Sequence, residues 1–128
     1  MRAADTNILL RLLLRDDPRQ TAAAEAFVRD GIWISHLVLA EAAWTLESAY
    51  GFEPTQIAEV VEKLLDNPVV ALQDIDVVLA ALAQFKAKAG IELSDCLILE
   101  IARKAGHSPL GSFDRKFAKL PGVEQIGR

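Results

Sequence analysis

The stretch Gly31-Ile32-Trp33-Ile34-Ser35, which leads directly into His36–Tyr50 and then Gly51, gives the clearest indication of the fold class. Its first part is a short run of β-branched and aromatic residues, which is typical of a strand. Ser35 is a favourable N-cap for a helix, and a glycine such as Gly51 commonly follows the last turn of one. The stretch therefore predicts a strand that passes directly into a helix.

The same alternation continues on both sides of this stretch. Strands are expected at residues 2–5, 31–35, 69–72, 108–112 and 123–126, and helices at 7–14, 18–30, 35–50, 54–67, 74–89 and 94–104. Ser94 is the expected N-cap of the last of these helices. Strands that alternate with helices form a parallel sheet with helices packed on it. We therefore predict an α/β fold with a central parallel β-sheet of about five short strands, flanked by helices on both faces.

The size and composition of the chain favour one globular domain. Its 128 residues suffice for a single core, and 52% of them are hydrophobic. No internal repeat, low-complexity tract or linker interrupts the sequence. We expect a single domain of residues 1–128.

Several classes of protein are disfavoured by the sequence. No apolar run approaches the roughly 20 residues that a membrane helix needs, and the start lacks the features of a secretory signal. Cys96 is the only cysteine, which excludes an intrachain disulfide and fits a cytoplasmic protein without membrane contact. The net charge of −4 argues against a nucleic-acid binder held mainly by a basic surface, but not against an enzyme that meets phosphates through metal ions.

Four acidic residues stand in unusually apolar surroundings. Glu41 lies within Leu37–Trp44, which is apolar nearly all round, and Asp95 precedes an equally apolar run. Asp5 lies between a strand and a leucine-rich helix, and Asp114 follows a strand. A helix that is apolar all round is usually buried, and a buried carboxylate must be paired, protonated or bound to a metal. These acids are therefore our candidate site.

The predicted topology places these acids at one edge of the sheet, because ligands of such folds bind at the carboxyl ends of the strands. Converging carboxylates repel one another, and a divalent cation with oxygen ligands, Mg²⁺ or Mn²⁺, would stabilise them. The alternative for each acid taken alone is a helix cap or a salt-bridge partner. For the whole set this alternative is weaker, because no matching set of basic residues lies in the apolar segments.

At these residues the sequence resembles the PIN-domain nucleases, and among them the VapC-type toxins of type II toxin–antitoxin pairs. The resemblance covers essentially the whole chain and rests on an ordered set of motifs: Asp5-Thr6-Asn7-Ile8-Leu9, Leu39-Ala40-Glu41, Ser94-Asp95-Cys96-Leu97-Ile98, Ser112-Phe113-Asp114-Arg115-Lys116-Phe117 and Leu120-Pro121-Gly122-Val123. Ser112 stands where threonine is commoner, and Glu92 stands where many relatives have aspartate. Glu92 is therefore a possible extra acid.

The resemblance implies a metal-dependent endoribonuclease that uses Mg²⁺ or Mn²⁺. Asp5 and Asp95 would be direct metal ligands, and Glu41 and Asp114 would bind directly, through water, or position the nucleophile. Outer groups that orient these carboxylates by hydrogen bonds would be Thr6, Asn7 and Ser112, although Asn7 is equally well explained as a helix N-cap. The implied partners are an RNA substrate, a cognate antitoxin protein and a second copy of the chain in a homodimer.

Three other functions remain open at this stage. One is a non-catalytic PIN-like binding module, which would be expected to lose some of the acids. Another is a PIN-like processing nuclease that is not a toxin. The third is a phosphohydrolase with Asp5 as nucleophile, which Asn7 disfavours because haloacid-dehalogenase-type enzymes have a second aspartate at that position.

Overall fold

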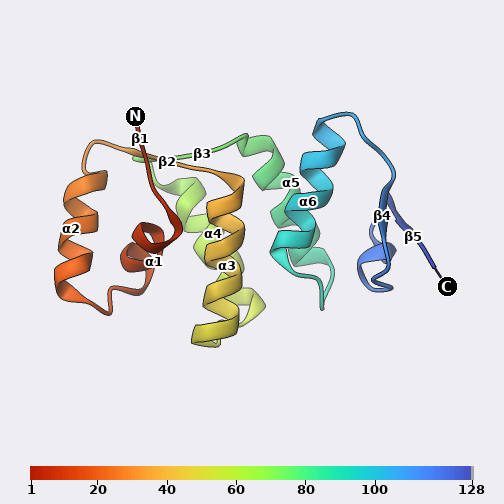
Figure 1. Ribbon diagram of the computed structural model, residues 1–128, viewed down its shortest axis with the longest axis horizontal. Coiled ribbons are helices and arrows are strands. Elements are labelled where there is room, and N and C mark those ends of the chain that lie inside the picture. The colour runs from red at the N-terminus through yellow and green to blue at the C-terminus, as the bar shows by residue number, and fades with distance from the viewer. Residues whose placement is uncertain (128) are drawn as a thin grey trace. The chain divides into compact units, whose positions relative to one another are not determined.

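The computed structural model describes residues 1–127 of the chain, which contain six α-helices, one short 3₁₀ helix and five β-strands (Figure 1). These elements form two compact units. The first unit comprises Met1–Ile75, and the second begins at Asp76. Each unit is described by itself below.

The first unit contains a three-stranded parallel sheet in the order β1-β2-β3. Ala3 of β1 pairs with Trp33 of β2, and Trp33 pairs with Ala71 of β3. Because all three strands run the same way, the segments that follow them begin at one edge of this sheet. The elements of the unit, in chain order, are β1 (Arg2–Ala3), α1 (Thr6–Leu14), α2 (Pro18–Val28), β2 (Ile32–Ile34), α3 (His36–Tyr50), α4 (Pro54–Asp66) and β3 (Val70–Leu72).

Helix α3 begins and ends where its sequence indicates. The Ser35 hydroxyl oxygen accepts a hydrogen bond from the backbone N–H of Val38 at 3.2 Å, which caps the helix. Gly51 adopts a φ of 67° after the last turn, a left-handed conformation that glycine takes without a steric penalty. The sequence-based prediction for this helix is therefore confirmed.

Two other helices begin at residues that differ from the predicted ones. The N-cap of α1 is Asp5, whose carboxylate accepts from the Ile8 N–H at 3.0 Å, so the interpretation of Asn7 as an N-cap is wrong. Helix α6 (Leu93–Lys104) has Glu92 in its cap position rather than Ser94. In both helices an acid, Asp5 or Glu92, adopts the extended backbone conformation that an N-cap requires, and the predicted residue does not occupy the cap position.

The core of the first unit is aliphatic and draws on both its sheet and its helices. The two outer residues of β2 are each 1% exposed, whereas Trp33 between them is 39% exposed. This alternation is the expected pattern of a strand with one face on a core. Fully buried side chains of the unit are those of Leu9, Ile32, Ile34, Leu46 and Val61.

The second unit contains a two-stranded parallel sheet, in which Ser112 of β4 pairs with Gln125 of β5. The Ile126 N–H continues this pairing by donating to the Ser112 carbonyl at 2.8 Å. Arg103 joins α6 to the loop before β5, because its guanidinium donates to the Pro121 carbonyl at 2.8 Å. The elements are α5 (Ile75–Ala87), α6 (Leu93–Lys104), β4 (Leu110–Ser112), η1 (Phe117–Lys119) and β5 (Val123–Gln125).

The predicted α/β class is confirmed, with five short strands, all in parallel pairs, that alternate with helices. Backbone hydrogen bonds pair the strands as one sheet of three and one of two. The organisation as a single domain of residues 1–128 stays a prediction. Within residues 1–127 no helix is both long and apolar enough to cross a membrane.

Candidate functional site

The first unit carries Asp5 and Glu41 on the two helices that follow neighbouring strands. Asp5 lies between β1 and α1, and Glu41 lies in the second turn of α3, which follows β2. The Thr6 hydroxyl donates a hydrogen bond to Oε2 of Glu41 at 2.9 Å, so the first residue of α1 holds a carboxylate of α3. This bond joins two of the predicted motifs at the carboxyl edge of the β1-β2-β3 sheet.

Asp5 has a local structural role that leaves part of its carboxylate available. Its Oδ1 atom accepts the capping hydrogen bond from Ile8, and the side chain is exposed. Within residues 1–127, Oδ2 accepts no hydrogen bond. The alternative reading of Asp5 as a helix cap is thus correct, and it is compatible with a second partner on Oδ2.

The second unit carries Asp95 near two further acids. Asp95 lies in the first turn of α6 and is partly buried. Burial, the negative charge of Glu92 and the negative charge of Asp114, in that order, raise the pKa of Asp95. The repulsion of Asp95 by Asp114 agrees with the expected repulsion between acids of the site, and the extra acid Glu92 adds to it. The convergence of all four acids stays a prediction.

Asp114 is held in a tight turn directly after β4. Its Oδ1 atom accepts from the backbone N–H groups of Lys116 at 2.9 Å and Phe117 at 3.3 Å. The Ser112 hydroxyl oxygen accepts from the backbone N–H of Asp114 at 3.1 Å, so Ser112 orients the turn through the main chain rather than through the carboxylate. The Asn7 side chain is exposed and hydrogen-bonds to none of the acids in the part of the chain that the structure describes.

The expectation that the four acids are buried is wrong for three of them. Asp5, Glu41 and Asp114 are exposed, and only Asp95 is partly buried. Helix α3 explains the error, because it buries one face and presents the opposite face outward. Leu37 and Trp44, which share the outward face with Glu41, are 68% and 59% exposed. Apolar neighbours along a helix therefore do not guarantee burial of the acid between them.

Two polar residues that the sequence did not single out stabilise the surroundings of the candidate acids. The Gln73 side-chain oxygen accepts from the backbone N–H of His36 at 2.9 Å, which ties the residue after β3 to the start of α3. Glu100, on α6, is only 7% exposed and pairs with Arg103 at 3.4 Å. Glu100 and Arg103 stand three residues apart in one helix, and this spacing in the sequence could have predicted their ion pair.

Cys96 follows Asp95 directly and is buried. Burial, followed by the charges of Asp95 and Glu100, raises the pKa of the Cys96 thiol to about 12. A thiol with such a pKa is almost entirely protonated at neutral pH and is a poor nucleophile or metal ligand. Cys96 is 0% exposed and therefore belongs to the core.

The donor chemistry of the acids fits a hard divalent cation. All of the candidate ligands are carboxylates. The raised pKa of Asp95 reflects its burial first and then the negative charges of Glu92 and Asp114, which a bound cation would offset. Among residues 1–127, no group of three or more histidine, cysteine or acidic side chains is arranged to hold a metal ion. The metal-binding role of the acids is therefore a proposal, supported by their chemistry.

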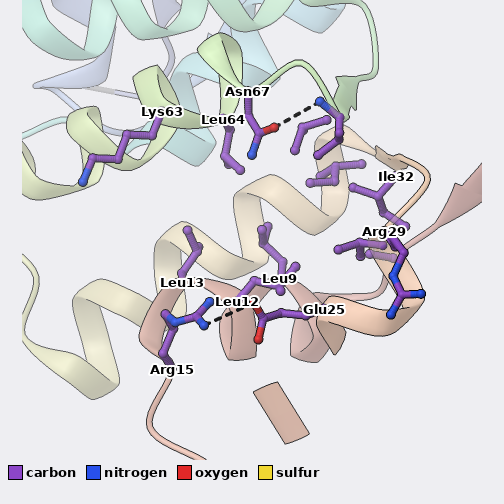
Figure 2. A pocket seen from close by; sticks show the side chains of 15 residues that line it. Leu9, Leu12, Leu13, Arg15, Glu25, Arg29, Ile32, Lys63, Leu64 and Asn67 are labelled. Carbon is purple, nitrogen blue, oxygen red and sulfur yellow. Dashed lines mark hydrogen bonds and ion pairs between the residues drawn. The ribbon is translucent and has the colours of Figure 1, made fainter. Parts of the chain in front are cut away.

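A separate cavity of about 350 Å³ opens in the first unit, beside α1, α2, α4 and the sheet (Figure 2). Leucine side chains of α1 and α4 point into it, and the ion pair between Arg15 and Glu25, at 3.2 Å, lies at its rim. None of the candidate acids lines this cavity. Its lining is mostly apolar, and its charged residues are Arg15, Arg29 and Lys63 against the single acid Glu25, which makes it unsuitable for a metal ion with oxygen ligands.

Comparison with known proteins gives two matches. The family model of the PIN domain matches residues 3–123, a range that includes all four candidate acids. The chain is also similar to a protein named VapC ribonuclease from Aquifex aeolicus (strain VF5). The two are 27% identical over 125 residues, which cover 94% of this chain and 92% of the relative.

Proposed function

The chain belongs to the PIN domain family, and from this premise we propose that it is a metal-dependent endoribonuclease and the toxin of a VapBC-type toxin–antitoxin pair. The observation that carries the proposal is the acidic set itself. Asp5, Glu41, Asp95 and Asp114 lie within the matched range, in the sequence motifs that resemble those of this family. The name of the relative, a VapC ribonuclease, supports RNA as the substrate and a toxin as the role.

The residues have distinct roles in this proposal. Asp5 and Asp95 bind Mg²⁺ or Mn²⁺, and Glu41 and Asp114 assist them directly or through water. When bound, the metal supplies an activated water and offsets the negative charge that develops on the attacked phosphate. Thr6 keeps the carboxylate of Glu41 in place through its 2.9 Å hydrogen bond, as outer groups do at metal sites.

The proposed partners follow from the same role. A toxin requires a cognate antitoxin, and we propose that an arginine or lysine of that protein pairs with the exposed carboxylates. A homodimer is supported by the outward face of α3, where Leu37 and Trp44 are exposed on either side of Glu41. We place the protein in the cytoplasm, where RNA and antitoxin would both be present.

Cleavage of a labelled RNA by the purified protein tests the nuclease proposal. We expect cutting with Mg²⁺ or Mn²⁺ and none with EDTA, and we expect Asp5→Asn and Asp95→Asn each to abolish cutting. Asp66→Asn is the matched control, because it makes the same chemical change at an exposed acid at the end of α4. Normal cutting by both site variants in excess Mg²⁺ would show that the proposed site is wrong.

The toxin role has a separate test in cells. Expression of the wild-type chain should arrest growth, and co-expression of a small protein encoded beside it should restore growth. Asp95→Asn should not arrest growth, because arrest depends on RNA cleavage in this proposal. A chain that cuts RNA in vitro but never affects growth would indicate a processing nuclease instead.

A further inference from the structure

A hollow of about 520 Å³ lies in the second unit and is lined by Phe113, Arg115, Gln125 and Gly127. Phe113 is the residue directly after β4, and Gln125 is the last residue of β5, so the hollow lies at the carboxyl ends of both parallel strands. This is the edge at which parallel sheets bind ligands. Asp114, one of the candidate acids, lies between two of the lining residues in the sequence.

One side of the Phe113 ring lies close to Gly127, and most of the ring is uncovered. It is 77% exposed, which is unusual for a phenylalanine. Gly127 supports one side of it, because a Cβ atom added to Gly127 would lie 3.1 Å from Cε1 of the ring. Gly127 also has a φ of +66°, so a larger residue there would be both strained and too close to the ring. The open side of the ring is a flat apolar surface.

Two polar side chains that line the hollow, those of Arg115 and Gln125, are available to bind a ligand. Within the part of the chain that the structure describes, the side chains of Arg115 and Gln125 have no hydrogen-bond or ion-pair partner. Residues 76–128 contain eight Lys and Arg residues and six Asp and Glu residues, whereas residues 1–75 contain six and twelve. The positive charge of the chain is thus concentrated in the unit that carries the hollow, which favours an anionic ligand.

We propose that this hollow binds one unstacked base of a single-stranded RNA, with the base on the Phe113 ring and the adjoining phosphate on Arg115. Aromatic side chains stack on the bases of single-stranded RNA whatever their identity, and the Gln125 carboxamide can both donate to and accept from a base edge. The next residue along the chain from Phe113 is Asp114, so a base held here would place its neighbouring phosphodiester beside a candidate acid. The inference rests on the proposed RNA substrate and adds a specific subsite for it.

The test measures the binding of a short fluorescein-labelled single-stranded RNA in EDTA, where no cleavage is expected. Phe113→Ala should weaken binding by about 5- to 150-fold, the usual range for loss of one base stack, and Phe113→Tyr should restore it. Arg115→Gln should reduce the slope of log affinity against log salt by about 0.7, which corresponds to one lost phosphate contact on a single strand. Leu79→Ala is the control, because Leu79 is 52% exposed on α5, outside the hollow.

Each outcome of this experiment supports or overturns the proposal. Unchanged affinity for Phe113→Ala, or an equal loss for Leu79→Ala, would overturn it, as would a wild-type chain that does not bind the RNA. If the wild type cleaves RNA and Phe113→Ala cleaves with an unchanged KM, the subsite is wrong while the nuclease stands. If Phe113→Ala loses RNA binding but the wild type never cleaves, the subsite stands and the nuclease proposal is wrong.

Discussion

The hydrogen bond from Thr6 to Glu41 allows a sharp test of the candidate site, because one hydroxyl can be removed with little other change. Thr6→Val keeps the shape of the side chain and removes the group that donates to Oε2 of Glu41 at 2.9 Å. A hydrogen bond to a charged group stabilises a fold by about 1.5–3 kcal/mol, and we expect about 1 kcal/mol here because water can reach the exposed carboxylate. With a total stability of about 5–15 kcal/mol, the variant stays folded.

The expected loss of activity is much larger than the loss of folded protein. Outer groups that orient the carboxylates of metal sites typically contribute about 10- to 100-fold to metal affinity or activity. We therefore expect Thr6→Val to cleave RNA about 10- to 100-fold more slowly at a fixed Mg²⁺ concentration, with partial recovery as the Mg²⁺ concentration rises. Thr6→Ser should remain close to the wild type, because it keeps the hydroxyl.

A matched control for Thr6→Val lies on α3, the helix that carries Glu41. The Thr45 hydroxyl also donates to Glu41 at 2.9 Å, but to its backbone carbonyl rather than to its carboxylate. Thr45→Val therefore removes the same chemical group without affecting the orientation of the carboxylate. Single-turnover cleavage rates and thermal unfolding of all three variants would be compared. Equal rates for Thr6→Val, Thr45→Val and the wild type would refute the view that Thr6 orients a catalytic Glu41.

Three further predictions concern stability and reactivity. The pKa of Asp95 is raised in the folded state, so the ionised form of this side chain destabilises the fold. The free energy of unfolding therefore falls as the pH rises from the ordinary aspartate pKa of about 3.9 through the higher pKa of the folded state. Asp95→Asn should therefore raise the Tm at neutral pH in the absence of metal, and this gain should disappear in strong acid. An unchanged or lower Tm at neutral pH, measured by calorimetry, would contradict this prediction. Because the thiol pKa is about 12, iodoacetamide in mildly alkaline buffer should modify Cys96 only after unfolding, as mass spectrometry with and without urea would reveal. Leu46 is 0% exposed, and urea unfolding of Leu46→Ala should show a loss of about 2–5 kcal/mol, whereas a loss below 1 kcal/mol would mean that the site is not packed as described.

Much of the fold could be predicted because its helix ends depend on local chemistry. Ser35 caps α3 and Gly51 ends it through bonds and backbone angles that involve only nearby residues. The two wrong caps, at Asn7 and Ser94, each had an acid nearby that takes the extended cap conformation instead. Strand pairing was harder to foresee, because β1 has only two residues and its partner in β2 lies 30 positions away in the sequence.

The identities of the candidate acids could be predicted, whereas their surroundings could not. A count of apolar neighbours placed Glu41 in the interior, but only one face of α3 is covered, and the face with Glu41 is exposed. Which face of a helix is covered depends on its packing partners, which lie far away in the sequence. The same limit applies to the hollow beside Phe113, because Gly127 reaches that ring only through the pairing of β4 with β5.

The proposal that Asp5 and Asp95 bind a divalent metal ion is tested most directly by thermal unfolding with Mn²⁺. At 100 times its Kd, a bound ion stabilises the folded chain by about 2.7 kcal/mol, which for a domain of this size raises the Tm by roughly 8–14 °C. We predict that Asp5→Asn and Asp95→Asn each remove this rise at the same Mn²⁺ concentration, whereas Asp66→Asn keeps it. A full rise in either of the two site variants would contradict the claim.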